Sequence, residues 1–152
     1  MIVKLNQLPL YQKKTVLVDG CFDPLHLGHI EYFKFAASFG LPVLCNVEND
    51  CYIKKYKRRP SLLPAYQRLL IVDSVKYISL THLQTTSTAD VLKRLRPVKY
   101  IKGADWKKKR LPQEEIDICK KYDIQIEYMN KNFDSSSKLL IGFIRKYSRF
   151  KE

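Results

Sequence analysis

The stretch that decides the fold runs from Thr15 to His29 and reads Thr-Val-Leu-Val-Asp-Gly-Cys-Phe-Asp-Pro-Leu-His-Leu-Gly-His. Its first four residues are β-branched or aliphatic, and an Asp-Gly turn signal follows, which predicts a short buried strand over 15–18. From His29 to Phe39 apolar residues recur at helical spacing, and Gly40 stands where a helix is commonly closed. The stretch therefore predicts a strand that leads through a loop into a helix.

The same alternation of strands and helices continues along the chain. Further strands are predicted over 42–47, 76–80, 99–102 and 124–128, and further helices over 67–74, 89–95, 112–122 and 137–147. Strands that alternate with helices at this spacing form βαβ units, in which helices cover both faces of a parallel sheet. The sequence therefore predicts the α/β class, as a single Rossmann-like domain over residues 1–152. Its five-stranded sheet is expected to be mostly parallel, with helices on both faces.

The net charge is the unusual feature of the composition. The chain has 152 residues, with 28 Lys and Arg against 15 Asp and Glu, a formal net charge of +13. A field of this sign attracts anions, whether nucleic acid, an acidic membrane face or phosphorylated small molecules. The basic residues are spread along the chain, and neither a helix-turn-helix nor a zinc motif is evident, so we expect no nucleic-acid partner.

Neither a membrane span nor a signal peptide is evident. No apolar run approaches the ~20 residues that span a bilayer, and residues 1–10 lack the apolar core and cleavage site of a signal peptide. The cysteines form neither a CxxC pair nor a cluster with zinc spacing: Cys21, Cys45, Cys51 and Cys119. Free thiols favour a reducing compartment. We therefore expect a cytoplasmic protein with no membrane partner.

The loop after the first strand has the features of a phosphate-binding site. Ligands of parallel α/β sheets bind beyond the carboxyl ends of the strands, and this loop places His26, Gly28 and His29 at the expected N-terminus of a helix. Free N–H groups and a partial positive charge make such a terminus attractive to phosphate. The imidazoles add donors, and the glycine lets the backbone approach closely. A single histidine is more often a packing or surface residue, but two around a glycine at this turn favour a phosphate site.

Gly20–His29 resembles the GxFDxxHxGH signature of the cytidylyltransferase-like nucleotidyltransferases. Further segments resemble those of the family in the same order: Asn46–Asp50, Arg59-Pro60 with Gln67-Arg68, Leu95–Trp106, and Ser135–Ser137. The Leu95–Trp106 segment is most similar to the heptose-phosphate adenylyltransferase branch. The Gly-Cys-Phe-Asp sequence is equally typical of cytidylyltransferases, among them the glycerol-phosphate branch.

This resemblance implies a nucleotidyl transfer. A phosphate of the acceptor attacks the α-phosphorus of ATP or CTP, and pyrophosphate leaves. The nucleophile is already an anion, so the protein aligns the reactants and neutralises charge without supplying a base. The implied partners are the nucleotide and a small phosphorylated sugar, polyol or amino-alcohol. The implied cofactor is Mg²⁺, held mostly by the triphosphate and water.

The resemblance also implies roles for individual residues. Those expected to act in catalysis are His26, His29, Lys54, Lys55 and Arg68. Those expected to contact the acceptor are Asp23, Asp50 and Arg68. Those expected to bind the nucleotide are Gly20, Cys21, Phe22, Gly28, Lys102, Gly103, Asp105, Trp106, Ser135, Ser136 and Ser137. No protein side chain is assigned to the metal.

Simpler explanations compete for several of these residues. Lys54 and Lys55 lie in a basic run that is equally typical of a solvated loop, and the choice among Lys54, Lys55 and Lys57 as the phosphate ligand stays open. Ser135–Ser137 would cap the last predicted helix whether or not they bind phosphate. Asp134 departs from the family pattern, because a carboxylate beside a triphosphate is unexpected.

Two other functions compete with the enzyme. The first is a catalytically degenerate member of the family that binds nucleotide or serves as a scaffold; the intact His26, Gly28 and His29 argue against it. The second is a basic nucleic-acid-binding domain. The resemblance further implies that the chain forms a homodimer.

Overall fold

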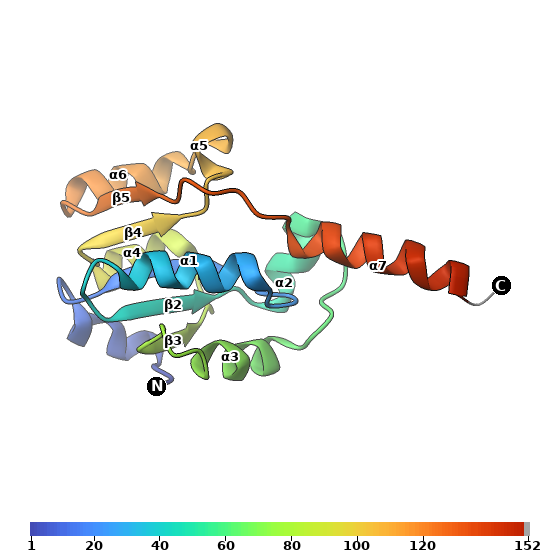
Figure 1. The fold of residues 1–152 in the computed structure, drawn as a ribbon. Coiled ribbons are helices and arrows are strands. Elements are labelled where there is room, and N and C mark those ends of the chain that lie inside the picture. Colours follow the sequence, from blue (N-terminus) through green and yellow to red (C-terminus); the bar gives the residue numbers. More distant parts are fainter. Residues whose placement is uncertain (151–152) are drawn as a thin grey trace.

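A five-stranded sheet forms the centre of the computed structural model, which describes residues 1–150. Its strands are β1 (Val16–Gly20), β2 (Val43–Val47), β3 (Leu80–Leu83), β4 (Lys99–Lys102) and β5 (Gln125–Tyr128). They lie in the order β3-β2-β1-β4-β5, and every neighbouring pair is parallel (Figure 1). The predicted α/β class and parallel sheet are confirmed.

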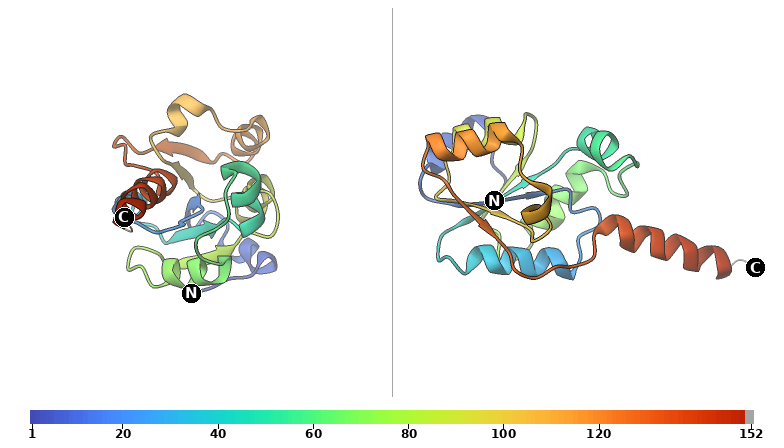
Figure 2. Two further views of the ribbon diagram at one scale, coloured as in Figure 1. Left: turned by 90° about the vertical axis from the view of Figure 1, so that its right-hand side faces the viewer. Right: turned by 90° about the horizontal axis from the view of Figure 1, so that it is seen from above.

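Helices cover both faces of the sheet, as predicted (Figures 1 and 2). Alternate residues of β1 point to opposite faces, so Val16 and Val18 join one apolar core and Leu17 joins the other. The helices α1 (Leu27–Ala37) and α3 (Ala65–Asp73) complete the first core. The second is completed by α4 (Thr88–Leu95), α6 (Gln113–Lys121) and the 3₁₀ helix η1 (Leu5–Tyr11).

The third strand lies later in the sequence than predicted. The prediction over 76–80 was wrong, because residues 75–79 form turns, bends and irregular chain, and β3 begins at Leu80. Pairing with β2 sets this boundary, since Leu44 is in register with Leu80 and Val47 with Leu83. An apolar pattern cannot reveal that register. The short helices α2 (Asp50–Tyr52), η2 (Ile53–Lys57, a π-helix) and α5 (Trp106–Lys109) were also not predicted.

The last helix, α7 (Ser136–Phe150), projects away from the rest of the molecule (Figures 1 and 2). It extends three residues past the predicted end at Tyr147, and none of its residues is buried. Across the described part of the chain, no helix has both the length and the apolarity needed to cross a membrane.

The order of the strands fixes where a ligand can bind. The chain runs outward from β1 through β2 to β3, then returns to the other side of β1 to form β4 and β5. A crevice opens at such a reversal, between the carboxyl ends of the two strands on which it turns. The loops after β1 and β4 therefore flank the candidate site.

Candidate active site

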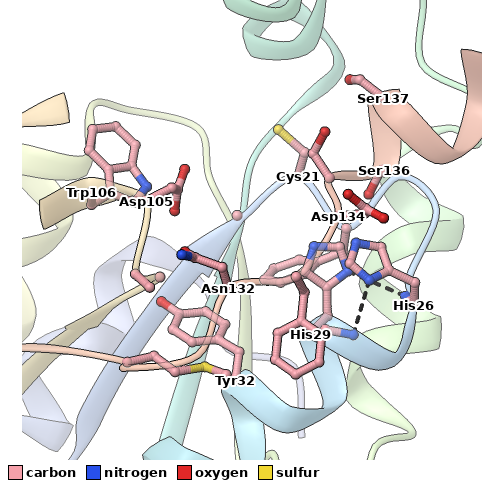
Figure 3. A pocket seen from close by; sticks show the side chains of 18 of the residues that line it. Cys21, His26, His29, Tyr32, Asp105, Trp106, Asn132, Asp134, Ser136 and Ser137 are labelled. Carbon is pink, nitrogen blue, oxygen red and sulfur yellow. Dashed lines mark hydrogen bonds between the residues drawn. The ribbon is translucent and has the colours of Figure 1, made fainter. Parts of the chain in front are cut away.

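A cavity of about 380 Å³ lies at the carboxyl edge of the sheet. Its walls come from the ends of β1 and β4, the N-terminus of α1 and the chain that leads into α7 (Figure 3). His26 and His29 line it, as do all the residues predicted to bind nucleotide: Gly20, Cys21, Phe22, Gly28, Lys102, Gly103, Asp105, Trp106, Ser135, Ser136 and Ser137. The fold thus brings together residues from opposite ends of the sequence.

The two histidines are held as hydrogen-bond donors toward the cavity. His26 caps α1, and its Nδ1 accepts the backbone N–H of Gly28 at 3.1 Å. The Nδ1 of His29 accepts the backbone N–H of His26 at 3.3 Å (Figure 3). Because each Nδ1 accepts a hydrogen bond, each neutral ring carries its own proton on Nε2. The Nε2 of His26 is buried and has no hydrogen-bond partner within the described residues, a state that an acceptor atom of a bound ligand would relieve.

Burial keeps both imidazoles neutral. It lowers the pKa of His29 to about 3, with help from the neighbouring His26 ring and the positive charge of Lys57. Burial also lowers the pKa of His26, although the carboxylate of Asp134 opposes that shift. The ring centroids are 3.9 Å apart, and two protonated rings at that separation would repel each other. The free site at neutral pH therefore offers two N–H donors without a formal charge.

Gly28 is required by close packing at the start of α1. A Cβ atom at this position would lie 2.6 Å from the Cβ of Phe133 and 2.9 Å from Cε1 of His26. Only glycine lets the chain that leads into α7 pass this close to the start of α1. The signature glycine therefore shapes the cavity wall, and its own N–H group is used to hold the ring of His26.

A buried ion pair joins the ends of β1 and β4. The Nζ of Lys102 donates to Asp19 at 2.7 Å, and the hydroxyl of Tyr100 donates to the same carboxylate. The Nζ also lies 4.3 Å from the centre of the Trp106 ring. Lys102 is therefore fixed at the cavity floor, with its charge balanced by Asp19, a residue that the sequence analysis did not select.

Glu48 is a second carboxyl group that the sequence analysis missed. It accepts a hydrogen bond from the thiol of Cys21 at 2.9 Å. Burial, reinforced by the charge of Asp19, raises the pKa of Glu48 to about 7, and the same two causes raise the pKa of Glu115 to about 7. The edge of the sheet thus holds more acidic groups than its lysine can fully compensate. Glu48 and Glu115 lie far along the sequence from His26 and His29, so the histidine motif gave no reason to select them.

The structure places Arg68 away from the cavity in which it was expected to act. Its guanidinium is fully buried and does not line the cavity. Its Nη1 donates to the carbonyl oxygens of Cys21 and Glu48, its Nε to that of Leu63, and its Nη2 to Asp50. Arg68 therefore fastens the loops after β1 and β2 to α3. Sequence spacing places this residue on α3 but cannot say that its side chain turns inward.

Asp23 and Asp50, the two carboxylates predicted to contact the acceptor substrate, also form their hydrogen bonds with groups of the protein. Asp23 is fully buried and accepts from the backbone N–H groups of Leu62 and Leu63 and from Arg59. Asp50 pairs with Arg68 and accepts the N–H of Ala65. Neither lines the cavity, so both hold loops in place instead of contacting a ligand there.

The structure shows which lysine of the basic run faces the cavity, a choice that the sequence left open. Lys57 lines the cavity, whereas Lys54 lines none of the cavities described and Lys55 faces a neighbouring one. Arg59, which had been noted only within a family segment, lines the cavity and donates through Nε to the hydroxyl of Ser137 at 3.1 Å. The turn of the π-helix decides which of these side chains face the site.

A second cavity of about 420 Å³ adjoins the first. The two share the side chains of Asp19, Lys102 and Trp106 as a common wall. The rest of the second cavity comes from the loops after β2 and β3 and from α6; its polar and aromatic residues include Asn49, Tyr52, Lys55, Tyr56, Gln84, Ser87 and Glu115. Two ligands bound in these cavities would therefore meet at the end of β1.

Comparison with known proteins places this site in a family. A model of the cytidylyltransferase-like family matches residues 17–147. The chain is 30% identical over 107 residues to the bifunctional protein HldE of Nitratiruptor sp., which covers 68% of the chain and 23% of HldE. It is 34% identical over 88 residues to the FAD synthase of Thermococcus kodakarensis, which covers 57% of the chain and 59% of that enzyme. The chain thus matches only part of the length of each relative.

Solved structures show the same fold. A lipopolysaccharide core biosynthesis protein from Thermoplasma volcanium superimposes with a TM-score of 0.66 at 21% identity, over 78% of this chain and 98% of that one. A pantoate–β-alanine ligase from Francisella tularensis gives 0.57 at 13% identity, over 90% of this chain and 69% of that one. The matched segment of the family model contains both histidines, the buried Lys102–Asp19 pair and the start of α7. This chain belongs to the cytidylyltransferase-like family.

Proposed function

We propose that this chain is a nucleotidylyltransferase that transfers the nucleoside monophosphate of ATP or CTP to the phosphate of a small acceptor. The acceptor is a phosphorylated sugar, polyol or amino-alcohol, and the second product is pyrophosphate. The observation that carries the proposal is the pair of neutral imidazoles, which present Nε2–H donors at a helix N-terminus inside a cleft. Family membership supports the same class of reaction.

The cleft offers separate places for the parts of a nucleotide. The triphosphate fits the N-terminus of α1, where His26 and His29 donate hydrogen bonds and the helix dipole adds a partial positive charge. Lys57, which lines the same cavity, supplies positive charge, whereas the charge of Arg59 is already paired with the buried Asp23. The loop after β4, with Trp106 at its end, offers an aromatic surface for the nucleoside.

The acceptor fits the second cavity. From there its phosphate can reach the α-phosphorus across the shared wall at Asp19 and Lys102. A new bond forms from an acceptor oxygen to the α-phosphorus, and the bond to the β-phosphate oxygen breaks, with its electron pair leaving on pyrophosphate. No proton is transferred, so neutral donors and fixed cations are sufficient for the protein's part of the chemistry.

Magnesium is proposed to enter with the nucleotide. The described residues hold no cluster of three or more His, Cys, Asp or Glu arranged for a metal, and Asp105 and Asp134 line the cavity singly. Those oxygens fit a cation that keeps triphosphate and water as its main ligands, as Mg²⁺ does. When bound, the ion neutralises charge on the departing pyrophosphate.

The proposal is tested by measuring pyrophosphate release from each of the four nucleoside triphosphates. Each is combined with Mg²⁺ and a panel of sugar, polyol and amino-alcohol monophosphates. Activity with ATP or CTP and one acceptor class supports the proposal. Nucleotide binding without release of pyrophosphate from any pair would favour the degenerate scaffold instead.

Two variants test the site itself. His29→Ala removes one donor and should lower the turnover about 100-fold or more. Lys57→Ala should lower turnover with little change in stability, whereas Lys54→Ala, on the same short helix but outside the cavity, is the matched control. Equal effects of the two lysine substitutions would contradict the assignment of Lys57 to the triphosphate.

A further inference from the structure

The second cavity ends at the N-terminus of α4, where free hydrogen-bond donors line it. Residues 86–89 form this part of the wall, which we call the α4 end. The backbone N–H groups of Thr88 and Ala89, the first two residues of α4, donate to no carbonyl within the described residues. The hydroxyl oxygen of Ser87 accepts the N–H of Asp90, which leaves the hydroxyl hydrogen of Ser87 able to donate. These donors lie at the positive end of the helix dipole.

A buried side chain adds a donor that the protein does not use. Gln84 is 5% exposed and lines the second cavity. Its Oε1 accepts from the Nδ2 of Asn46 at 2.6 Å and from the hydroxyl of Thr88 at 3.4 Å. Its Nε2 donates to no group in the part of the chain that the structure describes. Because a buried amide group without a partner is costly, Gln84 points to a ligand independently of the helix terminus.

The charges around the α4 end suit an anion. Lys55 lines the same cavity and supplies a positive charge. Asp90, in the first turn of α4, does not line the cavity and is paired with Arg94 at 2.8 Å. The acidic residues that do line the cavity come from β1 and α6: Asp19, Glu114 and Glu115. Free N–H donors beside a cation match the oxygens of a carboxylate or a phosphate.

The strand order separates the α4 end from the place where the acceptor reacts. The helix α4 follows β3, and β3 lies two strands away from β1, whose end carries Asp19 in the wall shared by the two cavities. Neighbouring strands are about 4.8 Å apart, so the two places lie roughly 10 Å from each other. One phosphate group cannot occupy both. A ligand that spans them needs an anionic group at each end of a sugar-sized chain.

We propose that the α4 end of the second cavity binds a second anionic group of the acceptor, a carboxylate or a further phosphate, opposite its reacting phosphate. The acceptor is then a phosphorylated sugar acid or a sugar bisphosphate. The inference rests on the proposed function, because the nucleotidyl transfer defines which phosphate reacts. An amine at the same place would meet the donors with a charge of the wrong sign, and a neutral tail would leave Gln84 without a charged partner.

A change of charge at Ser87 tests the site while keeping the helix cap. Asp and Asn cap helices as well as Ser does, so Ser87→Asp and Ser87→Asn should both fold, which circular dichroism verifies. Only Ser87→Asp adds a negative charge beside the proposed anion. Lys55→Gln removes a positive charge, and Lys54→Gln, outside the cavities described, is its matched control.

Calorimetry without nucleotide compares three probes: a hexose 1-phosphate, the corresponding hexose 1,6-bisphosphate and the hexuronic acid 1-phosphate. We expect the two doubly anionic probes to bind at least about tenfold more tightly than the monophosphate. Ser87→Asp should abolish this difference, because like charges in contact repel, whereas Ser87→Asn should retain it. Equal affinity for all three probes would overturn the inference, and so would equal behaviour of the two Ser87 variants.

Pyrophosphate release with the same probes separates this inference from the proposed function. Transfer to the monophosphate as efficient as transfer to the doubly anionic probes would contradict the second anion site and leave the proposed function standing. Tight binding of a doubly anionic probe that Ser87→Asp abolishes, with no pyrophosphate released from any nucleotide, would support the anion site and contradict the proposed reaction.

Discussion

Arg68 provides a direct test of whether this site is organised as the structure shows. The family resemblance implies that Arg68 acts in catalysis and contacts the acceptor, whereas the structure places it in the core, where each of its three guanidinium nitrogens donates a hydrogen bond. Arg68→Met keeps most of the side-chain volume but removes the hydrogen bonds. It therefore separates a structural arginine from a catalytic one.

The expected loss of stability follows from the partners that Arg68 leaves behind. The carbonyl oxygens of Cys21, Glu48 and Leu63 lose a charged donor and keep little access to water. Each buried acceptor left without a partner costs about 1–3 kcal/mol. Asp50 is half exposed and can be solvated again, so its share is small. We expect the free energy of unfolding to fall by about 3–5 kcal/mol.

Urea unfolding followed by circular dichroism measures this change, and thermal unfolding should show a midpoint lowered by about 6–20 °C for a chain of this size. Arg94→Ala is the control, because within the described residues the side chain of Arg94 forms one partly exposed ion pair, with Asp90. Its removal should change stability by no more than about 0.5 kcal/mol. If Arg68→Met lost less than about 1 kcal/mol while turnover fell sharply, the structural role assigned here would be refuted.

Three further predictions concern the cleft. Gly28→Ala should lower the free energy of unfolding by about 1–3 kcal/mol and weaken ATP or CTP binding in calorimetry, because the new methyl group overlaps Phe133. Unchanged affinity would show that Phe133 moves aside without affecting the cavity. Nitrogen NMR of His26 and His29 should show neutral rings protonated on Nε2 and no titration of His29 from about pH 5 to about pH 8, and an Nδ1–H signal would contradict the geometry. Because burial raises the pKa of Glu48 to about 7, its contribution to stability is complete below the unfolded value and is lost as the pH rises through 7. The unfolding free energy of the wild type should therefore fall relative to Glu48→Gln between about pH 5 and about pH 8, and parallel curves in urea unfolding would refute the shift.

The fold and the centre of the site could be predicted from the sequence because both depend on local patterns. Short β-branched runs that alternate with amphipathic segments leave few arrangements besides a parallel sheet with helices on both faces. A loop that carries His26, followed by a helix whose first turn holds Gly28 and His29, brings donors and a helix N-terminus together within a few residues. All of these features come from neighbours along the chain, so the residues alone specify them.

Other features depend on which groups the fold brings together across long separations, and only the tertiary structure decided them. Arg68 and Asp23 turned inward because carbonyl and N–H groups of distant loops needed partners in a dry interior. The start of β3 followed from its register with β2, and the turn of a π-helix made Lys57, not Lys54, face the cleft. The arm formed by α7 is amphipathic in sequence, but only the structure shows that its own domain leaves the apolar side uncovered. A side chain's direction is set by the partners it finds after folding, and the sequence around it does not contain them.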